Sequence, residues 1–258
     1  MKNASLLYPE ERRSEILNRV SRAGRVSVVD LSREFGVSPV TIRADLAYLD
    51  REARIIRTHG GAVSLGQSPE LSLSLRRRQN ISEKDRIGAF AATLVMNGEA
   101  IFLDTSSTAL ALARHLKKHH ELTVVTNGLA VAQVLLEAPG VNVVIPGGLL
   151  QRDTLSLVGT AGLSLLDGYN LQTGFFGAHG FTLREGLTDV SASVAEFKAA
   201  LRVRCRQVCA IFDHTKWGAV GLASFAAMDQ IHQIITDDGA PAELVEQARK
   251  NGIHVSLV

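Results

Sequence analysis

A run of hydroxyl side chains within DTSSTA, residues 104–109, is the stretch of this sequence best suited to binding chemistry. It follows EAIFLD, a short apolar segment typical of a buried strand, and it begins a segment with helical spacing. Backbone N–H groups and partial positive charge at a helix N-terminus favour an anion such as phosphate. One hydroxyl would suffice as an ordinary N-cap. The excess therefore favours an anion site made of Asp104, Thr105, Ser106, Ser107 and Thr108.

More polar residues follow other apolar segments or lie on the helices between them. LTVVTN ends in an amide, PGGLLQRD brings in an arginine after two glycines, and FDHTKWG presents a lysine suited to phosphate. The helical segment SVAEFKAAL carries a glutamate and a lysine two positions apart, which do not share a face. Singly, each has an ordinary explanation as a turn, a cap or a surface charge. Together they predict a polar, phosphate-binding crevice lined by Thr126, Asn127, Arg152, Glu196, Lys198 and Lys216.

The elements that must position these residues alternate regularly from residue 81 onward. Helical segments at 81–95, 105–119, 128–138, 193–204 and 240–252 are interleaved with short apolar strands. This alternation predicts an α/β domain with a parallel sheet. Ligands in such sheets bind outside the carboxyl ends of the strands, which is where the polar residues fall.

The first 65 residues have a different pattern. Helical spacing begins at Pro9 and ends at Gly24, and Ser27 is an expected N-cap of a second helix that ends at Gly36. A third helix follows with Ser38 as N-cap, Pro39 at its first position, and Val40, Ile42, Leu46 and Leu49 as its apolar positions. Two short helices joined by a turn of about three residues are typical of a helix-turn-helix.

A predicted hairpin, ARIIRTHGGAVSL, comes directly after the third helix. Gly60 and Gly61 are expected to supply the positive φ angles of its tight turn. Such a hairpin would form a wing, with Arg57 and His59 facing the DNA backbone or minor groove, while Thr41 and Arg43 of the third helix reach bases or phosphate. The alternative is a small three-helix fold whose arginines form a solvated face.

Composition limits the classes of protein without selecting one. The formal net charge is +2, and Lys and Arg outnumber Asp and Glu by 11 to 8 up to residue 65. Cys205 and Cys209 are poorly spaced for a disulfide and lack the His cluster of a zinc site, so we expect reduced thiols and no metal. Because the sequence has neither a signal-peptide pattern nor a run of about 18 apolar residues, we expect a cytoplasmic protein without a membrane partner.

The amino-terminal residues 10–63 resemble the DNA-binding domain of the DeoR family of bacterial transcriptional regulators. The resemblance is carried by the framework R…I…G…V…LS..FGVS..TIR.DL..L and by the closing R.HGGA. It implies that Ser38, Thr41 and Arg43 on a recognition helix contact operator DNA, together with Arg57 and His59 on the wing.

The rest of the chain resembles the sensor domain of the same family, which is similar in fold to ribose-5-phosphate isomerase. The matching segments are FLDTSSTALALARHL, TNGLAVAQVL, PGGLLQRDTLSLVG, GLTD…AEFK and DHTKWG. The resemblance implies a phosphate held by residues 105–108 and Lys216, with Asn127, Arg152, Glu196 and Lys198 at the sugar end. Two positions depart from the family pattern: Ser106 stands where Gly is common, and Ala199 where Arg is common.

We therefore expect a winged helix-turn-helix domain at 8–65, a linker at 66–80 and an α/β sensor domain at 81–258. Arg76, Arg77 and Arg78 in the linker are either a solvated hinge or an accessory contact to DNA phosphate. The expected function is a homo-oligomeric transcriptional repressor, a dimer or tetramer, that a phosphorylated sugar releases from DNA without any cofactor. The alternatives are a sugar-phosphate isomerase fused to a DNA-binding module, with Glu196 as the remaining candidate base, and an interaction module that binds no small molecule.

Overall fold

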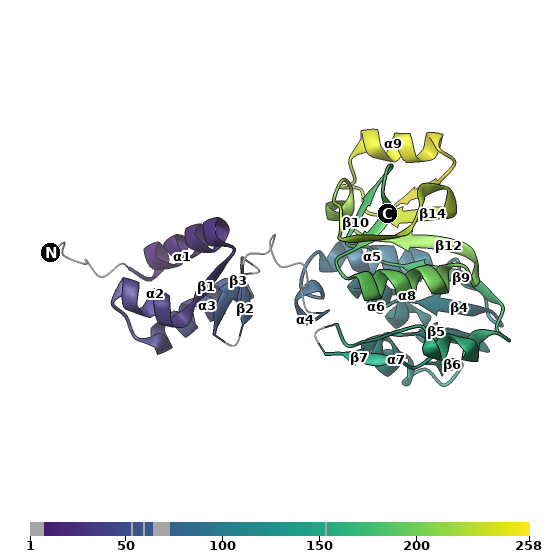
Figure 1. Cartoon of the computed structure of the whole chain (residues 1–258), viewed down its shortest axis with the longest axis horizontal. Helices are drawn as coiled ribbons and strands as arrows, with labels where there is room; N and C mark the ends of the chain where they lie inside the picture. The colour runs from purple at the N-terminus through teal and green to yellow at the C-terminus, as the bar shows by residue number, and fades with distance from the viewer. Residues whose placement is uncertain (1–7, 53, 59, 64–72, 153) are drawn as a thin grey trace. The chain divides into compact units, whose positions relative to one another are not determined.

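The computed structural model describes residues 8–52, 54–58, 60–63, 73–152 and 154–258. The chain divides into two compact units, Met1–Pro69 and Glu70–Val258. Each unit has its own helices and its own sheet (Figure 1). Among helices of the described residues, none is both long and apolar enough to cross a membrane.

The smaller unit is a winged helix-turn-helix, as predicted. Its elements are α1 Pro9–Ala23, β1 Arg25–Ser27, α2 Val28–Phe35, α3 Pro39–Arg51, β2 Ile56–Thr58 and β3 Gly61–Val63. The hydroxyls of Ser27 and Ser38 cap α2 and α3, accepting the N–H groups of Asp30 and Thr41 at 3.1 Å. Gly36, at φ 63°, ends α2 in the left-handed region that glycine adopts most readily.

Strand β1 was not predicted, and it changes the explanation for Gly61. The three strands form an antiparallel sheet in the order β1-β3-β2, with Val26 opposite Ala62. A Cβ atom on Gly61 would lie 1.9 Å from the Val26 carbonyl oxygen. Gly61 does not adopt the positive φ that we expected. Glycine is needed there because β1 and β3 approach closely.

The core of the smaller unit confirms most of the predicted apolar positions. Ile42, Leu46 and Leu49 are at most 3% exposed. Val40 is 71% exposed, so its prediction as one of the helix's apolar core positions was wrong. It lies on the surface that also carries Arg43, because the three core positions already define the buried face of α3.

A buried ion-pair network joins α1 to α3. Asp45 is 2% exposed, and its two carboxylate oxygens accept the Nε–H groups of Arg12 and Arg13 at 2.5 and 3.0 Å. The Arg13 guanidinium also lies 3.9 Å from the ring centroid of Tyr48. These contacts hold α3 against α1.

The larger unit is built on a seven-stranded sheet in which all adjacent strands are parallel, which confirms the predicted α/β architecture. The strand order is β15-β14-β12-β9-β4-β5-β6. In chain order the strands are β4 Ala100–Leu103, β5 Leu122–Thr126, β6 Val141–Val144, β9 Leu171–Phe176, β12 Cys205–Ile211, β14 Gln233–Thr236 and β15 His254–Leu257.

Helices cover both faces of this sheet. One buried cluster includes Ile87 of α5, Leu112 of α6 and Val131 of α7, and a second includes Phe197 of α8 and Val245 of α9. The helices are α4 Leu73–Arg76, α5 Ile81–Ala92, α6 Ser107–His115, α7 Leu129–Leu135, α8 Ala192–Arg202 and α9 Ala242–Lys250. Short 3₁₀ turns are η1 Leu116–Lys118, η2 Ala161–Leu166, η3 His214–Lys216 and η4 Met228–Gln230. Helix α4 falls within the predicted linker, yet it belongs to the larger unit.

Two small antiparallel sheets supplement the parallel one, and neither was predicted. One has the order β10-β11-β13, with β10 Gly180–Thr182, β11 Gly186–Asp189 and β13 Ala223–Ala226. The other pairs β7 Leu149–Gln151 with β8 Ser156–Val158. These strands have three or four residues, which is too short for alternation to separate them from a loop.

Candidate functional site

Asp104 joins the carboxyl ends of two neighbouring strands, β4 and β9. Its Oδ1 accepts the N–H of Ser106, and its Oδ2 accepts the N–H of Gly177, both at 2.9 Å. A Cβ on Gly177 would lie 2.3 Å from the Cβ of Ser106. The side chain of Ser106 therefore fills the room that this glycine leaves.

Lys198 reaches the same place from α8. Its ammonium lies 2.9 Å from Asp104 Oδ2 and 2.8 Å from Asp189 Oδ2, and it donates to the Gly177 carbonyl at 2.9 Å. Although burial acts to lower it, these two carboxylates hold the pKa of Lys198 above its ordinary value. Burial acts to raise the pKa of Asp189, but Lys198 holds it below its ordinary value. Glu196, two residues earlier on α8, is exposed.

The four hydroxyl residues at 105–108 are all buried, none more than 9% exposed. Ser106 is the N-cap of α6, since its Oγ accepts the N–H of Ala109 at 3.0 Å. Within the described residues, the hydroxyls of Thr105, Ser107 and Thr108 make no hydrogen bond. The N-cap thus accounts for one hydroxyl of the four, and three remain at the N-terminus of a nine-residue helix.

Asn127 follows the adjacent strand β5 and is 2% exposed. Its amide nitrogen donates to the Leu157 carbonyl at 2.9 Å, but its Oδ1 is buried without a hydrogen-bond partner. The chain runs close to the hydroxyl run here, because a Cβ on Gly128 would lie 3.2 Å from the Cα of Thr105. Thr126, fully buried, accepts the N–H of Gly128 at 3.0 Å. A buried acceptor without a donor is costly unless a ligand or water supplies one.

Lys216 brings a further positive charge from η3. It is partly buried, and its charge shifts the pKa values of two neighbouring side chains. Burial and the charge of Lys216 lower the pKa of His179. The pKa of Asp213 is lowered despite burial, by hydrogen bonding from Thr215 and by the charge of Lys216. Arg152 is exposed at the turn between β7 and β8.

We call this group the strand-end site. It consists of Asp104, Thr105, Ser106, Ser107, Thr108, Asn127, Asp189, Lys198 and Lys216. Sequence reasoning missed Asp189 as a member of its surroundings, although this residue stands in the segment GLTD that carried the resemblance. It also missed His179, which lies outside those segments. It also missed Lys84 and Arg76, whose charges act on the neighbouring groups and which no motif indicates.

The predicted DNA-contacting residues of α3 and the wing are accessible. Ser38, Arg43 and Arg57 are exposed and Thr41 is partly exposed. The hydroxyls of Ser38 and Thr41 lie 2.9 Å apart at the start of α3. The predicted contact at His59 lies outside the described residues.

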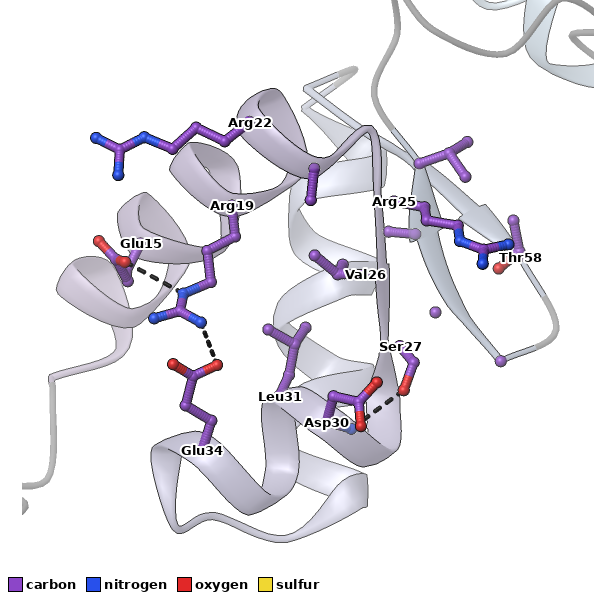
Figure 2. A pocket seen from close by; sticks show the side chains of 15 residues that line it. Glu15, Arg19, Arg22, Arg25, Val26, Ser27, Asp30, Leu31, Glu34 and Thr58 are labelled. Carbon is purple, nitrogen blue, oxygen red and sulfur yellow. Dashed lines mark hydrogen bonds and ion pairs between the residues drawn. The ribbon is translucent and has the colours of Figure 1, made fainter.

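A hollow of about 770 Å³ lies on the smaller unit between α1, β1, α2 and the wing strands (Figure 2). Arg19 spans it, paired with Glu15 at 3.2 Å and also with Glu34. The acidic residues thus neutralise much of its basic lining. Of the predicted DNA contacts that the structure describes, Ser38, Thr41, Arg43 and Arg57, none lines this hollow.

The described residues contain no group of three or more His, Cys, Asp or Glu side chains that could hold a metal ion. Cys205 and Cys209 are free thiols on β12. Burial raises the pKa of Cys205 to about 12 and raises that of Cys209 as well. Both thiols are therefore protonated and unreactive near neutral pH.

Two family models match the chain. The DeoR-like helix-turn-helix domain matches residues 12–68, and the DeoR C terminal sensor domain matches residues 79–238. The chain is 37% identical to the HTH-type transcriptional regulator GolR of Listeria innocua, over 97% of this chain and 99% of that protein. It is 29% identical to the Glycerol-3-phosphate regulon repressor of Escherichia coli K12, over 96% of this chain and 98% of that protein.

Among solved structures, ribose 5-phosphate isomerase A of Methanocaldococcus jannaschii aligns with a TM-score of 0.40 and 17% identity. That alignment covers 54% of this chain and 55% of the isomerase. Each family model falls within one of the two units of the structure. The chain belongs to the DeoR family of helix-turn-helix transcriptional regulators.

Proposed function

We propose that this regulator represses a carbohydrate-catabolism operon in the cytoplasm and that a phosphorylated sugar bound at the strand-end site releases it from the operator. The observation that carries the proposal is the buried, unpartnered Oδ1 of Asn127 beside the three unbonded hydroxyls of Thr105, Ser107 and Thr108. A sugar hydroxyl can donate to the amide oxygen. A phosphate can accept from the three hydroxyls and from backbone N–H groups at the start of α6.

Electrostatics supports the same ligand class. Lys198 balances one of the two carboxylates of Asp104 and Asp189, and Lys216 adds a second cation beside the site, so a dianion would not meet a net negative charge. The name of one relative, the Glycerol-3-phosphate regulon repressor, joins a phosphorylated compound to repression. In our proposal Arg152 and Glu196 approach the sugar only after a ligand is bound, because both are exposed in the structure.

On the DNA side, we propose that α3 enters the major groove and the wing contacts the backbone. Ser38, Thr41 and Arg43 would make the α3 contacts, and Arg57 and His59 those of the wing. A homo-oligomer, a dimer or a tetramer, would place two such units on paired half-sites, which multiplies the modest specificity of one unit.

A thermal-shift screen of the full chain against phosphorylated sugars tests the ligand. A true effector at a hundredfold excess over its Kd should raise the unfolding temperature of the larger unit by about 5–10 °C. Lys216→Ala should blunt this shift and spare operator binding, whereas Arg43→Ala should weaken operator binding and spare the shift. Loss of both responses in either variant would contradict the division of labour between the units.

The isomerase alternative needs a free carboxylate base over the sugar. Asp104 and Asp189 are both engaged by Lys198, and Glu196 is exposed. We therefore expect no interconversion of pentose or hexose phosphates when they are incubated with the protein. Measurable turnover that Glu196→Gln abolishes would favour the enzyme instead.

A further inference from the structure

The antiparallel pair of β7 and β8, which we call the β7–β8 ribbon, has one fixed edge and one free edge. Strand β8 is fixed because Leu157 and Asn127 exchange two hydrogen bonds of 2.9 Å, one from the Leu157 N–H and one from the Asn127 amide. The N–H of Leu129 also donates to the Leu155 carbonyl at 2.9 Å. Among the described strands, β7 pairs with β8 alone. Its outer edge is therefore held in a defined position and is open to another strand.

Three leucines of the ribbon are exposed although their side chains are large and apolar. Leu149 is 74% exposed, Leu150 is 47% exposed and Leu155 is 43% exposed. Successive side chains of a strand point to opposite faces, so Leu149 and Leu150 have only the free edge of β7 in common. A partner that covers both must lie along this edge and not on one face of the ribbon.

Leu155 adds a cost in the backbone. Its φ of 49° lies in the left-handed region, which a residue as bulky as leucine rarely adopts. The exposed side chain offsets little of this cost, because much of its apolar surface still faces water. A strained backbone that presents an apolar side chain to solvent is typical of a surface that another molecule covers.

The charge of the ribbon indicates which partner it takes. Residues 145–151 and 154–158 include no charged side chain. A surface that meets its own copy about a two-fold axis brings each charge near its duplicate, so a self-contact favours an uncharged surface. Helix-turn-helix proteins also read paired half-sites as dimers. Both arguments favour a second copy of this chain over a different protein.

We propose that β7 pairs antiparallel, edge to edge, with β7 of a second copy, and that this contact joins two chains on one operator. The inference rests on the proposed function, which needs a homo-oligomer. A two-fold axis makes two copies of one strand antiparallel neighbours, so the two ribbons form one four-stranded sheet. The sheet gives the free edge of β7 its hydrogen-bond partners and covers Leu149 and Leu150 of both copies. Leu150 is the middle residue of β7 and lies nearest the axis.

The test introduces charge at the position nearest the axis. Leu150→Glu and Leu150→Lys each place two like charges close together, whereas an equal mixture of the two variants pairs opposite charges. Met96→Glu and Met96→Lys are the matched controls, because Met96 is 66% exposed and precedes β4 at the amino ends of the strands. The double variant Leu149→Thr/Leu150→Thr keeps the strand propensity and removes apolar surface.

Two measurements on the full chain are needed. Sedimentation velocity gives the number of chains in the assembly. Fluorescence anisotropy gives the affinity for a duplex that the wild-type protein selects from a random library.

The wild type should sediment as an oligomer. Each Leu150 variant and the double threonine variant should contain half as many chains and bind the selected duplex at least about tenfold more weakly, because linked units gain affinity from each other. The mixture of Leu150→Glu and Leu150→Lys should recover both the size and the affinity. The Met96 variants should match the wild type.

The outcomes separate the inference from the function beneath it. A wild type that binds the selected duplex as a monomer would contradict the homo-oligomer of the proposed function, and the inference with it. An oligomeric wild type whose size persists in the Leu150 variants would overturn the inference alone. Variants that dissociate without recovering in the mixture would also overturn it, because β7 would then not meet its own copy. If the charged variants do not fold, an unchanged size of the double threonine variant would overturn it, and a halved size would support it.

Discussion

Both units of the protein bury charge, but they do so in opposite ways. In the smaller unit one carboxylate, Asp45, is held by two guanidinium groups, those of Arg12 and Arg13. In the larger unit one ammonium, that of Lys198, is held by two carboxylates, those of Asp104 and Asp189. Each network ties a helix to a distant part of its unit.

The surroundings of the two networks differ. Both oxygens of Asp45 are paired, and the network lies between α1 and α3. The Lys198 network lies beside hydroxyls at 105, 107 and 108 that bond to no described residue, and beside the unpartnered Oδ1 of Asn127. Buried charge alone therefore does not indicate a ligand site. What distinguishes the larger unit is unused hydrogen-bonding capacity next to the charge, above all the Asn127 Oδ1, because an unpartnered buried acceptor is costly for stability.

Of the substitutions that test this comparison, Lys198→Met should have the largest effect on the free energy of unfolding. It leaves Asp104 and Asp189 buried without their cation, which should cost about 5 kcal/mol, at the upper end of the range for a broken buried pair. In a unit of this size that corresponds to a fall of about 10–20 °C in unfolding temperature, measured by calorimetry on the full chain. Glu196→Gln, on the exposed face of the same helix, is the control and should leave the temperature unchanged. A drop below about 3 °C for Lys198→Met would mean that the network is not stabilising.

Asp45→Asn is the matching change in the smaller unit and should cost less, about 3 kcal/mol. The amide can keep one hydrogen bond, but it removes the negative charge that Arg12 and Arg13 share at the interface of α1 and α3. We expect weaker operator binding with unchanged stabilisation by a phosphate ester, measured by anisotropy and thermal shift. Unchanged operator affinity would show that the position of α3 does not depend on this network. Glu10→Gln, on the exposed surface of α1, is the control.

Some features of the two units could be predicted from the sequence and others could not, for physical reasons. Helix caps such as Ser27 and Ser38 and the alternation of strands and helices are local patterns, and they were confirmed. Asp104 could be singled out because strand ends meet at one edge of a parallel sheet, and Lys198 because its segment AEFK carried the family resemblance. The role of Lys84 could not be predicted, because its ammonium donates to the Arg76 carbonyl of a four-residue helix and lies near the carboxylate of Asp213, more than a hundred residues away. Strand β1 was missed because three residues carry no detectable period.

Lys84 is a further buried charge of the larger unit, and the pH dependence of the free energy of unfolding tests it. We expect an effect of intermediate size. Burial lowers its pKa to about 8; Lys216 and Arg76 add to this, while Asp213 and Glu83 oppose it. A lysine whose pKa falls on folding binds fewer protons in the native state, so stability rises with pH between the native and unfolded pKa values. Relative to Lys84→Met, the wild type should gain about 2 kcal/mol between pH 7.5 and 9.5, measured by urea unfolding. If the difference in the free energy of unfolding between the wild type and Lys84→Met did not change across this pH range, the ammonium would have to be well solvated.

Val40→Ala has the smallest expected effect, and it tests how the smaller unit differs from the larger one at its functional surface. The candidate ligand groups of the sensor unit are buried, whereas Val40 is 71% exposed on α3 beside Arg43. Removing its two methyl groups should leave the unfolding temperature unchanged, since little apolar surface is buried there. If α3 lies in the major groove, Val40 can contact a thymine methyl, and its loss should weaken binding to the selected duplex by about 0.5–1 kcal/mol. Arg43→Ala should cost about 1–3 kcal/mol on the same duplex. Because an apolar contact reads a base and not the backbone, Val40→Ala should leave binding to random duplex unchanged; an equal loss on both duplexes would move Val40 out of the groove.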